Sequence, residues 1–153
     1  LASINMQEYI PNLCRKLFNA YKLDHDLIDL RINVEPISLD IDTAIPLGII
    51  INELITNSLK YAFSAGAKGF IEVNFIEKGG KLLLQVKDNG KGLADHTRSE
   101  ISFGMKLIKA FKEKLKAEIS VDGSNGFDVV CKIGKYKRLW PKNKSPLGIQ
   151  ATD

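Results

Sequence analysis

The stretch NELITNSLKY, residues 52–61, is followed about thirty residues later by DNGKG, residues 88–92. The first stretch has the apolar spacing of a helix, and the second is a glycine-spaced turn that directly follows an apolar run. Together they offer an oxygen ligand for a metal, a cation for phosphate, and a carboxylate beside bare backbone for a base. The pair, in this order, predicts a site for ATP.

Three polar residues form one stripe along the first stretch. Glu53, Asn57 and Lys60 stand at spacings i, i+4 and i+7, while Ser58 is grouped with the apolar remainder of the helix. The amide oxygen of Asn57 suits Mg²⁺, which keeps several waters and bridges phosphate oxygens. Lys60 can reach a phosphate as a point charge, and Glu53 could hold a water or act as a general base. The alternative is a solvated face of an ordinary amphipathic helix.

The glycine turn supplies the features of a base-binding site. Asp88 falls just past the end of an expected strand, where its carboxylate can accept a hydrogen bond from the exocyclic amine of adenine. Gly90 and Gly92 permit positive φ and a close approach of the backbone to a flat base, although Asp-Asn-Gly is also a common turn. Gly104 opens a later helix whose amides could face a phosphate, and Ser102 there is equally a plausible N-cap.

The periodicity of the chain predicts an α/β two-layer sandwich, with helices on one face of a mixed, mainly antiparallel sheet. The expected helices cover residues 4–21, 46–61 and 103–116, and the expected strands cover residues 27–34, 70–76, 81–87, 118–121 and 127–133. Pro46 is placed in the first turn of the second helix. The domain is expected to span residues 1–135, and residues 136–153, with two prolines and scattered lysines, to form a flexible tail.

Length and composition fit one globular domain with a real core: 153 residues, of which 44% are hydrophobic. The net charge of +4 comes largely from lysine-rich segments that lack the interleaved aromatic residues of single-strand nucleic-acid binders. A solvated helix face and a soluble tail are therefore favoured over a nucleic-acid surface. Cys14 and Cys131 lie in apolar patterns without C-x-x-C spacing, so we expect buried free thiols.

Taken together, these motifs resemble the ATP-binding catalytic domain of sensor histidine kinases. The wider superfamily includes type II topoisomerases, the 90-kilodalton heat-shock chaperones and mismatch-repair ATPases. Residues 52–61 resemble its N box, residues 88–92 match its D-x-G-x-G box, and residues 102–107 resemble its last glycine box in the form of the short-lid subgroup. The resemblance covers about residues 4–134 and implies the Bergerat ATP-binding fold.

The resemblance also implies roles for individual residues. Asn57 would coordinate Mg²⁺, Asp88 would bind adenine, and Lys60 and Tyr61 would lie by the phosphates and the ribose. The lid over the nucleotide would be residues 93–103. The residues expected to contact ATP are Asn57, Lys60, Tyr61, Asp88, Gly90, Gly92, Gly104, Met105 and Leu107, and the expected catalytic set is Glu53, Asn57 and Lys60.

By the same resemblance, the chain would be a protein histidine kinase module of a two-component system. It would transfer the γ-phosphoryl group of ATP to a histidine on separate dimerisation helices, because His25 falls in an expected loop and His96 in the expected lid. The acceptor is expected upstream of Leu1, in a homodimeric parent that passes the phosphoryl group to a response regulator receiver domain.

The module itself is expected to be monomeric and to face the cytoplasm, whether or not the parent is anchored in a membrane. No nucleic-acid partner is expected. Two alternatives stay open, a serine kinase of the anti-sigma-factor type and an ATP-binding interaction module without transfer activity.

Overall fold

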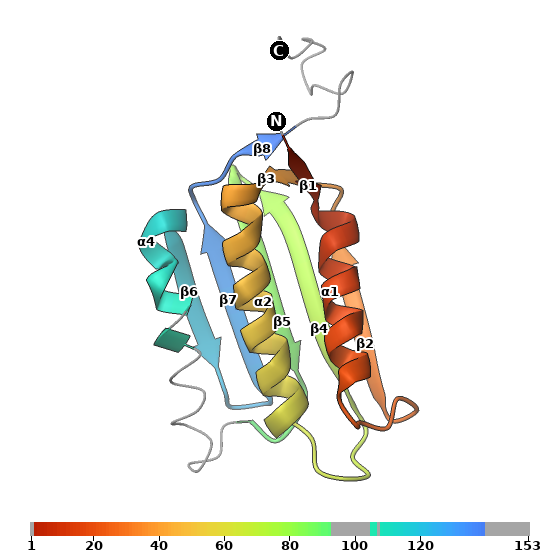
Figure 1. The fold of residues 1–153 in the computed structure, drawn as a ribbon. Coiled ribbons are helices and arrows are strands. Elements are labelled where there is room, and N and C mark those ends of the chain that lie inside the picture. The colour runs from red at the N-terminus through yellow and green to blue at the C-terminus, as the bar shows by residue number, and fades with distance from the viewer. Residues whose placement is uncertain (1, 93–104, 107, 140–153) are drawn as a thin grey trace.

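The computed structural model describes residues 2–92, 105–106 and 108–139, and shows one large sheet with helices on a single face (Figure 1). The strand order of that sheet is β2-β4-β5-β7-β6. β2 and β4 pair in parallel, and the other neighbouring strands pair antiparallel. The predicted two-layer sandwich is therefore confirmed. The strands of this sheet are β2 (Ile28–Val34), β4 (Gly69–Lys78), β5 (Lys81–Asp88), β6 (Ala117–Asp122) and β7 (Phe127–Ile133).

Alternation along the strands separates a buried face from a wet one. On β4, Ile71, Val73 and Phe75 are fully buried against the helices, whereas the intervening residues are only half-buried. The outward face instead carries a hydrogen-bonded row in which Asn74 donates to Gln85 and Gln85 donates to Asp128. The core thus lies between the sheet and the helices.

Two long helices, α1 (Met6–Ala20) and α2 (Ile41–Tyr61), pack side by side on the sheet (Figure 1). The residue before α1, Asn5, is an ordinary N-cap, and its side-chain oxygen accepts the amide of Gln7 at 3.0 Å. α2 lies at the centre of the helical layer, and more than half of its residues are buried. Such a helix tolerates a polar residue only where that residue has a partner.

α2 begins five residues before the start predicted at Pro46, which lies inside the helix. The short strand β3 (Ser38–Asp40) leads directly into α2, and the side chain of Asp40, the N-cap residue, accepts the Thr43 hydroxyl. Pro46 has no amide hydrogen to donate to the carbonyl of Asp42, an exposed residue in the first turn of α2. Residues 39–42, which were assigned to no predicted helix or strand, are therefore a strand end and a helix start.

The third predicted helix, residues 103–116, is not continuous over the part that the structure describes. Residues 105–106 and 108–110 are helical, Phe111 is in a turn, and α4 (Lys112–Leu115) follows. α4 ends at Lys116, which adopts the left-handed conformation with φ 45°. Gly104 and Leu107, two of the predicted nucleotide contacts, lie outside the described residues.

A second, small sheet of order β1-β3-β8 closes one end of the molecule, with β1 (Ser3–Asn5) and β8 (Arg138–Leu139) on either side of β3. The Tyr136 hydroxyl donates to Glu77 at 2.7 Å, and Arg138 pairs with the same carboxylate. Burial and this hydrogen bond raise the pKa of Tyr136 to about 12. The tail predicted from residue 136 is therefore anchored through residue 139; residues 140–153 lie outside the described part.

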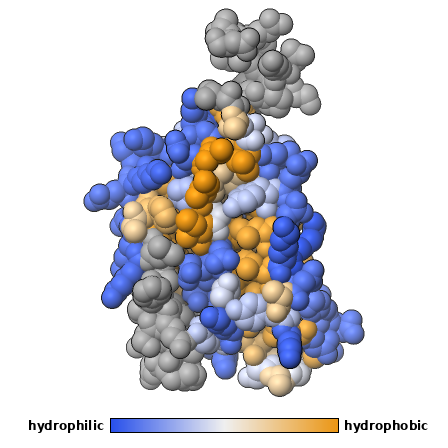
Figure 2. Space-filling view, in the orientation of Figure 1, coloured by the Kyte–Doolittle hydropathy of each residue, from blue (hydrophilic) through white to orange (hydrophobic). Residues whose placement is uncertain are grey.

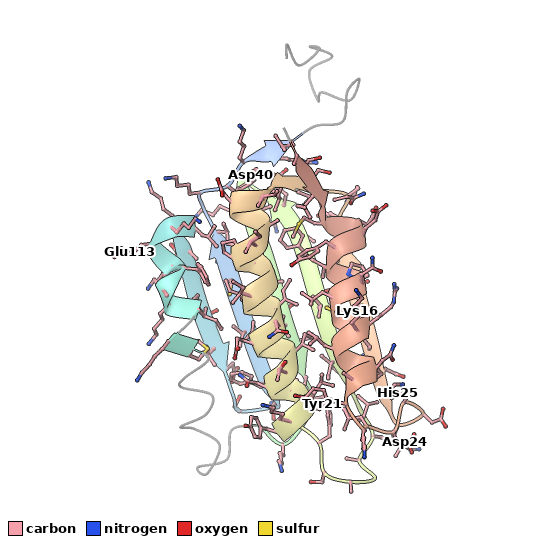
Figure 3. The ribbon with its side chains drawn as sticks, in the orientation of Figure 1. Lys16, Tyr21, Asp24, His25, Asp40 and Glu113 are labelled. Carbon is pink, nitrogen blue, oxygen red and sulfur yellow. The ribbon has the colours of Figure 1, made fainter. Side chains whose placement is uncertain are left out.

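Two surface features bear on the predictions. Apolar side chains show over α2 in the space-filling view (Figure 2), where Ile41 is 42% and Ile45 54% exposed. His25 is exposed in the loop after α1 (Figure 3), and its ring lies 4.5 Å from that of Phe18, centroid to centroid. It is a surface histidine, as expected.

The state of the two cysteines agrees with the sequence prediction. Cys14 and Cys131 are buried free thiols, as predicted. Burial raises their pKa values to about 12 and about 11, so both stay protonated at neutral pH. No helix in the described ranges is long and apolar enough to cross a membrane.

Candidate nucleotide site

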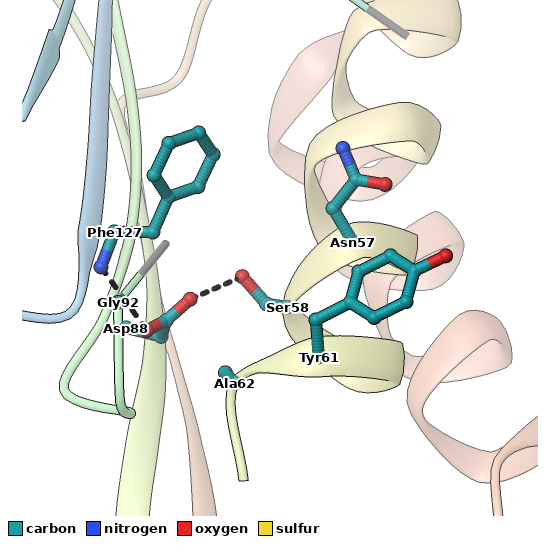
Figure 4. A pocket seen from close by; sticks show the side chains of 7 residues that line it. All are labelled: Asn57, Ser58, Tyr61, Ala62, Asp88, Gly92 and Phe127. Carbon is teal, nitrogen blue, oxygen red and sulfur yellow. Dashed lines mark hydrogen bonds between the residues drawn. The ribbon is translucent and has the colours of Figure 1, made fainter. Parts of the chain in front are cut away.

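The two sequence motifs meet where α2 ends beside the end of β5. The Ser58 hydroxyl on α2 donates to Oδ2 of Asp88 at 2.6 Å, and both residues are buried. This contact is one wall of a depression between the helix and the strand ends (Figure 4). The depression is lined by Asn57, Ser58, Tyr61, Ala62, Asp88, Gly92 and Phe127.

Asp88 is held by three donors. Oδ1 accepts the backbone amide of Gly90 at 3.0 Å. Oδ1 also accepts the backbone amide of Phe127 at 3.2 Å, and Oδ2 accepts the Ser58 hydroxyl (Figure 4). Burial raises the pKa of the carboxyl above its ordinary value, and the three hydrogen bonds counter this shift because they favour the charged form. Asp88 is the last residue of β5 rather than the first residue after it, so the sheet fixes its backbone.

Asn57 lies one residue before Ser58 and lines the same depression. It is 8% exposed, and its amide nitrogen Nδ2 is buried with no hydrogen-bond partner among the described residues. A buried donor without a partner costs about 1–3 kcal/mol, so such an atom in a pocket wall points to a ligand. A carboxamide also offers an oxygen of the kind that Mg²⁺ accepts.

Gly90 and Gly92 are needed for different reasons. Gly90 does not have a positive φ; it lies against the end of α2, and a Cβ there would stand 2.2 Å from the carbonyl oxygen of Ala62. Lys91 completes this junction by donating its amide to the same oxygen at 2.9 Å. Gly92 does take the predicted positive φ, at 72°, and lines the depression.

The remaining predicted residues are spread more widely. Tyr61 lines the depression, but Lys60 is exposed and lines a separate hollow of about 450 Å³ with Leu23 and Phe63. Glu53 is half-buried, one turn before Asn57, and does not line the depression. Met105 is half-buried against the core. The structure thus brings Asn57, Tyr61, Asp88 and Gly92 together and leaves Lys60 and Glu53 outside that group.

The depression itself is small. Its cavity of about 10 Å³ is close to the least that holds one water. A purine is much larger than this cavity, so its entry requires the surrounding chain to move. Residues 93–103, predicted to form the lid, lie outside the described part of the chain.

Sequence reasoning missed Ser58, Ala62 and Phe127. Ser58 was grouped with the apolar surface of the helix, although a hydroxyl buried on such a surface itself signals a partner. Phe127 lies opposite Asp88 in the register of β7 and β5, a pairing that follows only once the order of the strands is known. Ala62 contributes through its position at the end of α2.

A scan of known families gives an independent result. The family described as "Histidine kinase-, DNA gyrase B-, and HSP90-like ATPase" matches residues 42–141, about two thirds of the chain. The chain belongs to this family. Its matched region contains both the α2 motif and the Asp88 turn, so the predicted relationship to the ATPase domains of sensor histidine kinases is confirmed.

Individual relatives point to the histidine kinase branch of the family. The chain is 26% identical over 97 residues to blue-light-activated histidine kinase 2 of Erythrobacter litoralis (strain HTCC2594), and the match covers 61% of this chain. It covers only 28% of that relative, so the chain spans less than a third of the curated protein that it resembles.

Solved structures share the fold. The histidine kinase domain of the Erythrobacter litoralis EL346 blue-light activated histidine kinase superposes with a TM-score of 0.76 at 23% identity, over 86% of this chain and 61% of that one. The mycobacterial sensor histidine kinase MprB gives 0.65 at 15% identity, over 86% and 97%. ShkA in complex with AMPPNP gives 0.66 at 15% identity, over 89% of this chain and 31% of that one. The architecture is that of histidine kinase catalytic domains.

Proposed function

We propose that this chain is the ATP-binding catalytic module of a two-component sensor histidine kinase. In this proposal it binds Mg·ATP and presents the γ-phosphoryl group to a histidine carried by dimerisation helices of the full-length kinase. The observation that carries the proposal is the buried Asp88 carboxylate, which lines one depression together with Asn57, whose amide nitrogen has no hydrogen-bond partner among the described residues. Membership of the ATPase family supports it.

Asp88 is the residue suited to adenine. Its Oδ1 accepts two backbone amides, whereas Oδ2 accepts one hydroxyl and so keeps a free acceptor position. The exocyclic amine of adenine is a donor that fits this position, and the carbonyl of guanine is an acceptor that does not. Gly92 brings bare backbone to the same depression.

Asn57 is the residue suited to the metal and the phosphates. Its carboxamide oxygen is a neutral hard ligand, and its Nδ2, which has no partner in the described part of the chain, can donate to a phosphate oxygen. Among the described residues no cluster of three or more His, Cys, Asp or Glu side chains could hold a metal. That fits Mg²⁺, which is commonly bound through one or two protein ligands plus substrate phosphates. Held by Asn57, the ion would neutralise charge on the phosphates.

The proposed transfer asks little covalent chemistry of this chain. Phosphoryl transfer depends mainly on positioning and charge neutralisation, so an imidazole delivered from another domain is a sufficient nucleophile. Lys60, on the exposed side of α2, would have to swing from its separate hollow to reach a phosphate. Glu53 would act on a water or on the incoming imidazole. A serine acceptor or a binding-only module would use the same nucleotide contacts.

Calorimetric titration with AMPPNP tests the nucleotide site. In the chain without substitutions, called the parent protein from here on, we expect Mg²⁺ to strengthen the binding of AMPPNP. In Asn57→Ala, the affinity for AMPPNP should no longer depend on Mg²⁺. GMPPNP should bind weakly to both proteins. Asn33→Ala is the matched control, because it removes the same side chain from the outward face of β2. A folded parent protein that binds no AMPPNP, or an Asn57→Ala variant with full Mg²⁺ dependence, would contradict the assignment.

Transfer itself needs the acceptor. With radiolabelled ATP, we expect label to appear on the dimerisation helices of the full-length kinase in an acid-labile, alkali-stable form, the signature of phosphohistidine. Acid-stable label on a serine would favour the alternative kinase. Binding without label on either would favour the interaction module.

A further inference from the structure

Ser58 makes a buried hydrogen bond to Asp88, and the proposed nucleotide contacts do not include Ser58. The residue is 3% exposed on α2, and its hydroxyl reaches across to Oδ2 of Asp88 at 2.6 Å. Its neighbours Leu54, Ile55 and Leu59 are buried in the apolar core. A lone hydroxyl in such surroundings is stabilised only by the hydrogen bond that it makes.

The direction of that bond matters. A carboxylate oxygen has two acceptor positions, and the two amides on Oδ1 occupy both of them. The Ser58 hydroxyl takes one position on Oδ2, so a single acceptor position remains on the carboxylate. Ser58 comes from the helix and the two amides come from the turn and from β7, so three separate elements fix the orientation of the Asp88 carboxylate.

We propose that Ser58 is a positioning residue that sets the choice of base: by donating to Asp88 it keeps the remaining oxygen position an acceptor, and so selects purines with an amine at carbon 6. The inference rests on the proposed ATP binding and deepens it. Ser58 acts through Asp88 and does not itself supply the contact that distinguishes the bases.

Removal of the hydroxyl has a defined consequence. Oδ1 stays fixed by Gly90 and Phe127, but Oδ2 loses its partner and the carboxyl can hold a proton there. At this position a protonated Asp88 donates a hydrogen bond, whereas the ionised group accepts one. The protonated group therefore no longer favours a base that carries an amine. The loss should therefore fall on base selection and leave the contacts to the triphosphate.

The test compares ATP with purine riboside triphosphate, which lacks only the amine at carbon 6. We expect the parent protein to prefer ATP by about tenfold or more, the range of a hydrogen bond to a charged group. Ser58→Ala should reduce this preference several-fold while leaving the affinity for purine riboside triphosphate near that of the parent. Ser58→Thr, which restores a hydroxyl, should recover the preference, and Ser58→Cys, a weak donor, should not.

The ratio of the two affinities separates positioning from loosening of the fold, because a looser site would weaken both ligands together. Ser120→Ala, on the outward face of β6, serves as the control for loss of a serine hydroxyl. An unchanged ratio in Ser58→Ala, or failure of Ser58→Thr to recover it, overturns the role of Ser58 and leaves ATP binding standing. Failure of the parent protein to bind ATP overturns both, and the parent titration alone reveals it.

Discussion

Gly90 lies so close to the end of α2 that a Cβ on it would stand 2.2 Å from the carbonyl oxygen of Ala62 and 2.6 Å from the Cβ of Ala62. This contact joins the two sequence motifs through backbone alone. It also sets the distance between the helix that carries Asn57 and the strand end that carries Asp88.

Substitution of Gly90 tests that junction. Gly90→Ala should destabilise the protein by about 1–3 kcal/mol, because either α2 or the turn must move to admit the methyl group. It should also weaken ATP binding, because the same movement shifts Asp88. Chemical denaturation and calorimetric titration measure the two effects.

Gly134→Ala is the control for this substitution, since the nearest atom to its added Cβ lies at 3.3 Å and its φ is not positive. Its cost should stay within about 1 kcal/mol. Equal stability of the parent protein and Gly90→Ala would show that the junction is more yielding than its geometry implies.

The Asp88→Asn variant should lose function without losing stability. The amide oxygen can still accept Gly90 and Phe127, and the Ser58 hydroxyl can turn to accept the new amide group. The variant also removes a buried charge. We expect affinity for ATP to fall at least about tenfold, because a donor now faces the amine of adenine.

Thermal unfolding of the ligand-free Asp88→Asn variant should give a midpoint equal to or above that of the parent protein at neutral pH. A large drop in the midpoint would mean that the carboxylate supports the fold rather than the ligand. Unchanged ATP affinity would reject the adenine role.

The pH dependence of binding and of stability should have opposite signs at Asp88. Burial raises its pKa above 3.8, so between that value and the folded-state pKa the folded protein holds more protons than the unfolded chain. The contribution of Asp88 to stability therefore rises as pH falls through this window. Affinity for ATP should fall over the same window, since the amine of adenine needs an ionised acceptor.

Calorimetric titrations and denaturation curves across the acidic range, in the parent protein and in Asp88→Asn, isolate this group. As pH falls, the difference between the two proteins should show the gain in stability and the loss of ATP affinity that are assigned to Asp88. In Asp88→Asn, position 88 should contribute to neither trend. Parallel changes in both proteins would assign the pH dependence to other groups.

Lys116 offers a change that should stabilise the protein. It has φ 45° at the end of α4, a conformation that costs a residue with a side chain about 1–2 kcal/mol and costs glycine little. Lys116→Gly should therefore gain about 0.5–1 kcal/mol in the free energy of unfolding, after the larger entropy of a glycine in the unfolded chain is counted. Lys114→Gly, inside the same helix, should lose about 1 kcal/mol. A destabilised Lys116→Gly would contradict the interpretation.

The sequence was enough to predict the parts of the fold that are periodic and the parts of the site that are local. The apolar spacing around Asn57 predicted a helix, and the alternation before Asp88 predicted the strand that ends at it. The predicted start of α2 was wrong because Pro46 was interpreted as part of the first turn of the helix. The actual N-cap residue, Asp40, lies outside any apolar pattern. β1, β3 and β8 were missed because strands of two or three residues carry no periodicity.

The site was less predictable because its contacts join segments that are distant in sequence. The bond from Phe127 to Asp88 depends on the register of two strands, and the bond from Ser58 depends on how the helix turns over the sheet. Lys60 shows what helical spacing alone does not predict. It falls on the same stripe as Asn57, yet it lines a different hollow. Side-chain length and local surroundings, which spacing ignores, decide where such a residue reaches.

The small sheet places the two described ends of the chain side by side. Ser38 pairs with Asn5 on one flank and with Leu139 on the other, so the ends are about 10 Å apart across β3. They lie at the start of α2, and Asn57 is about 24 Å further along that helix. The domain is therefore suited to circular permutation: a short linker can close β1 to β8, and new termini opened at the exposed Ala65 would emerge beside the Asp88 end of the sheet.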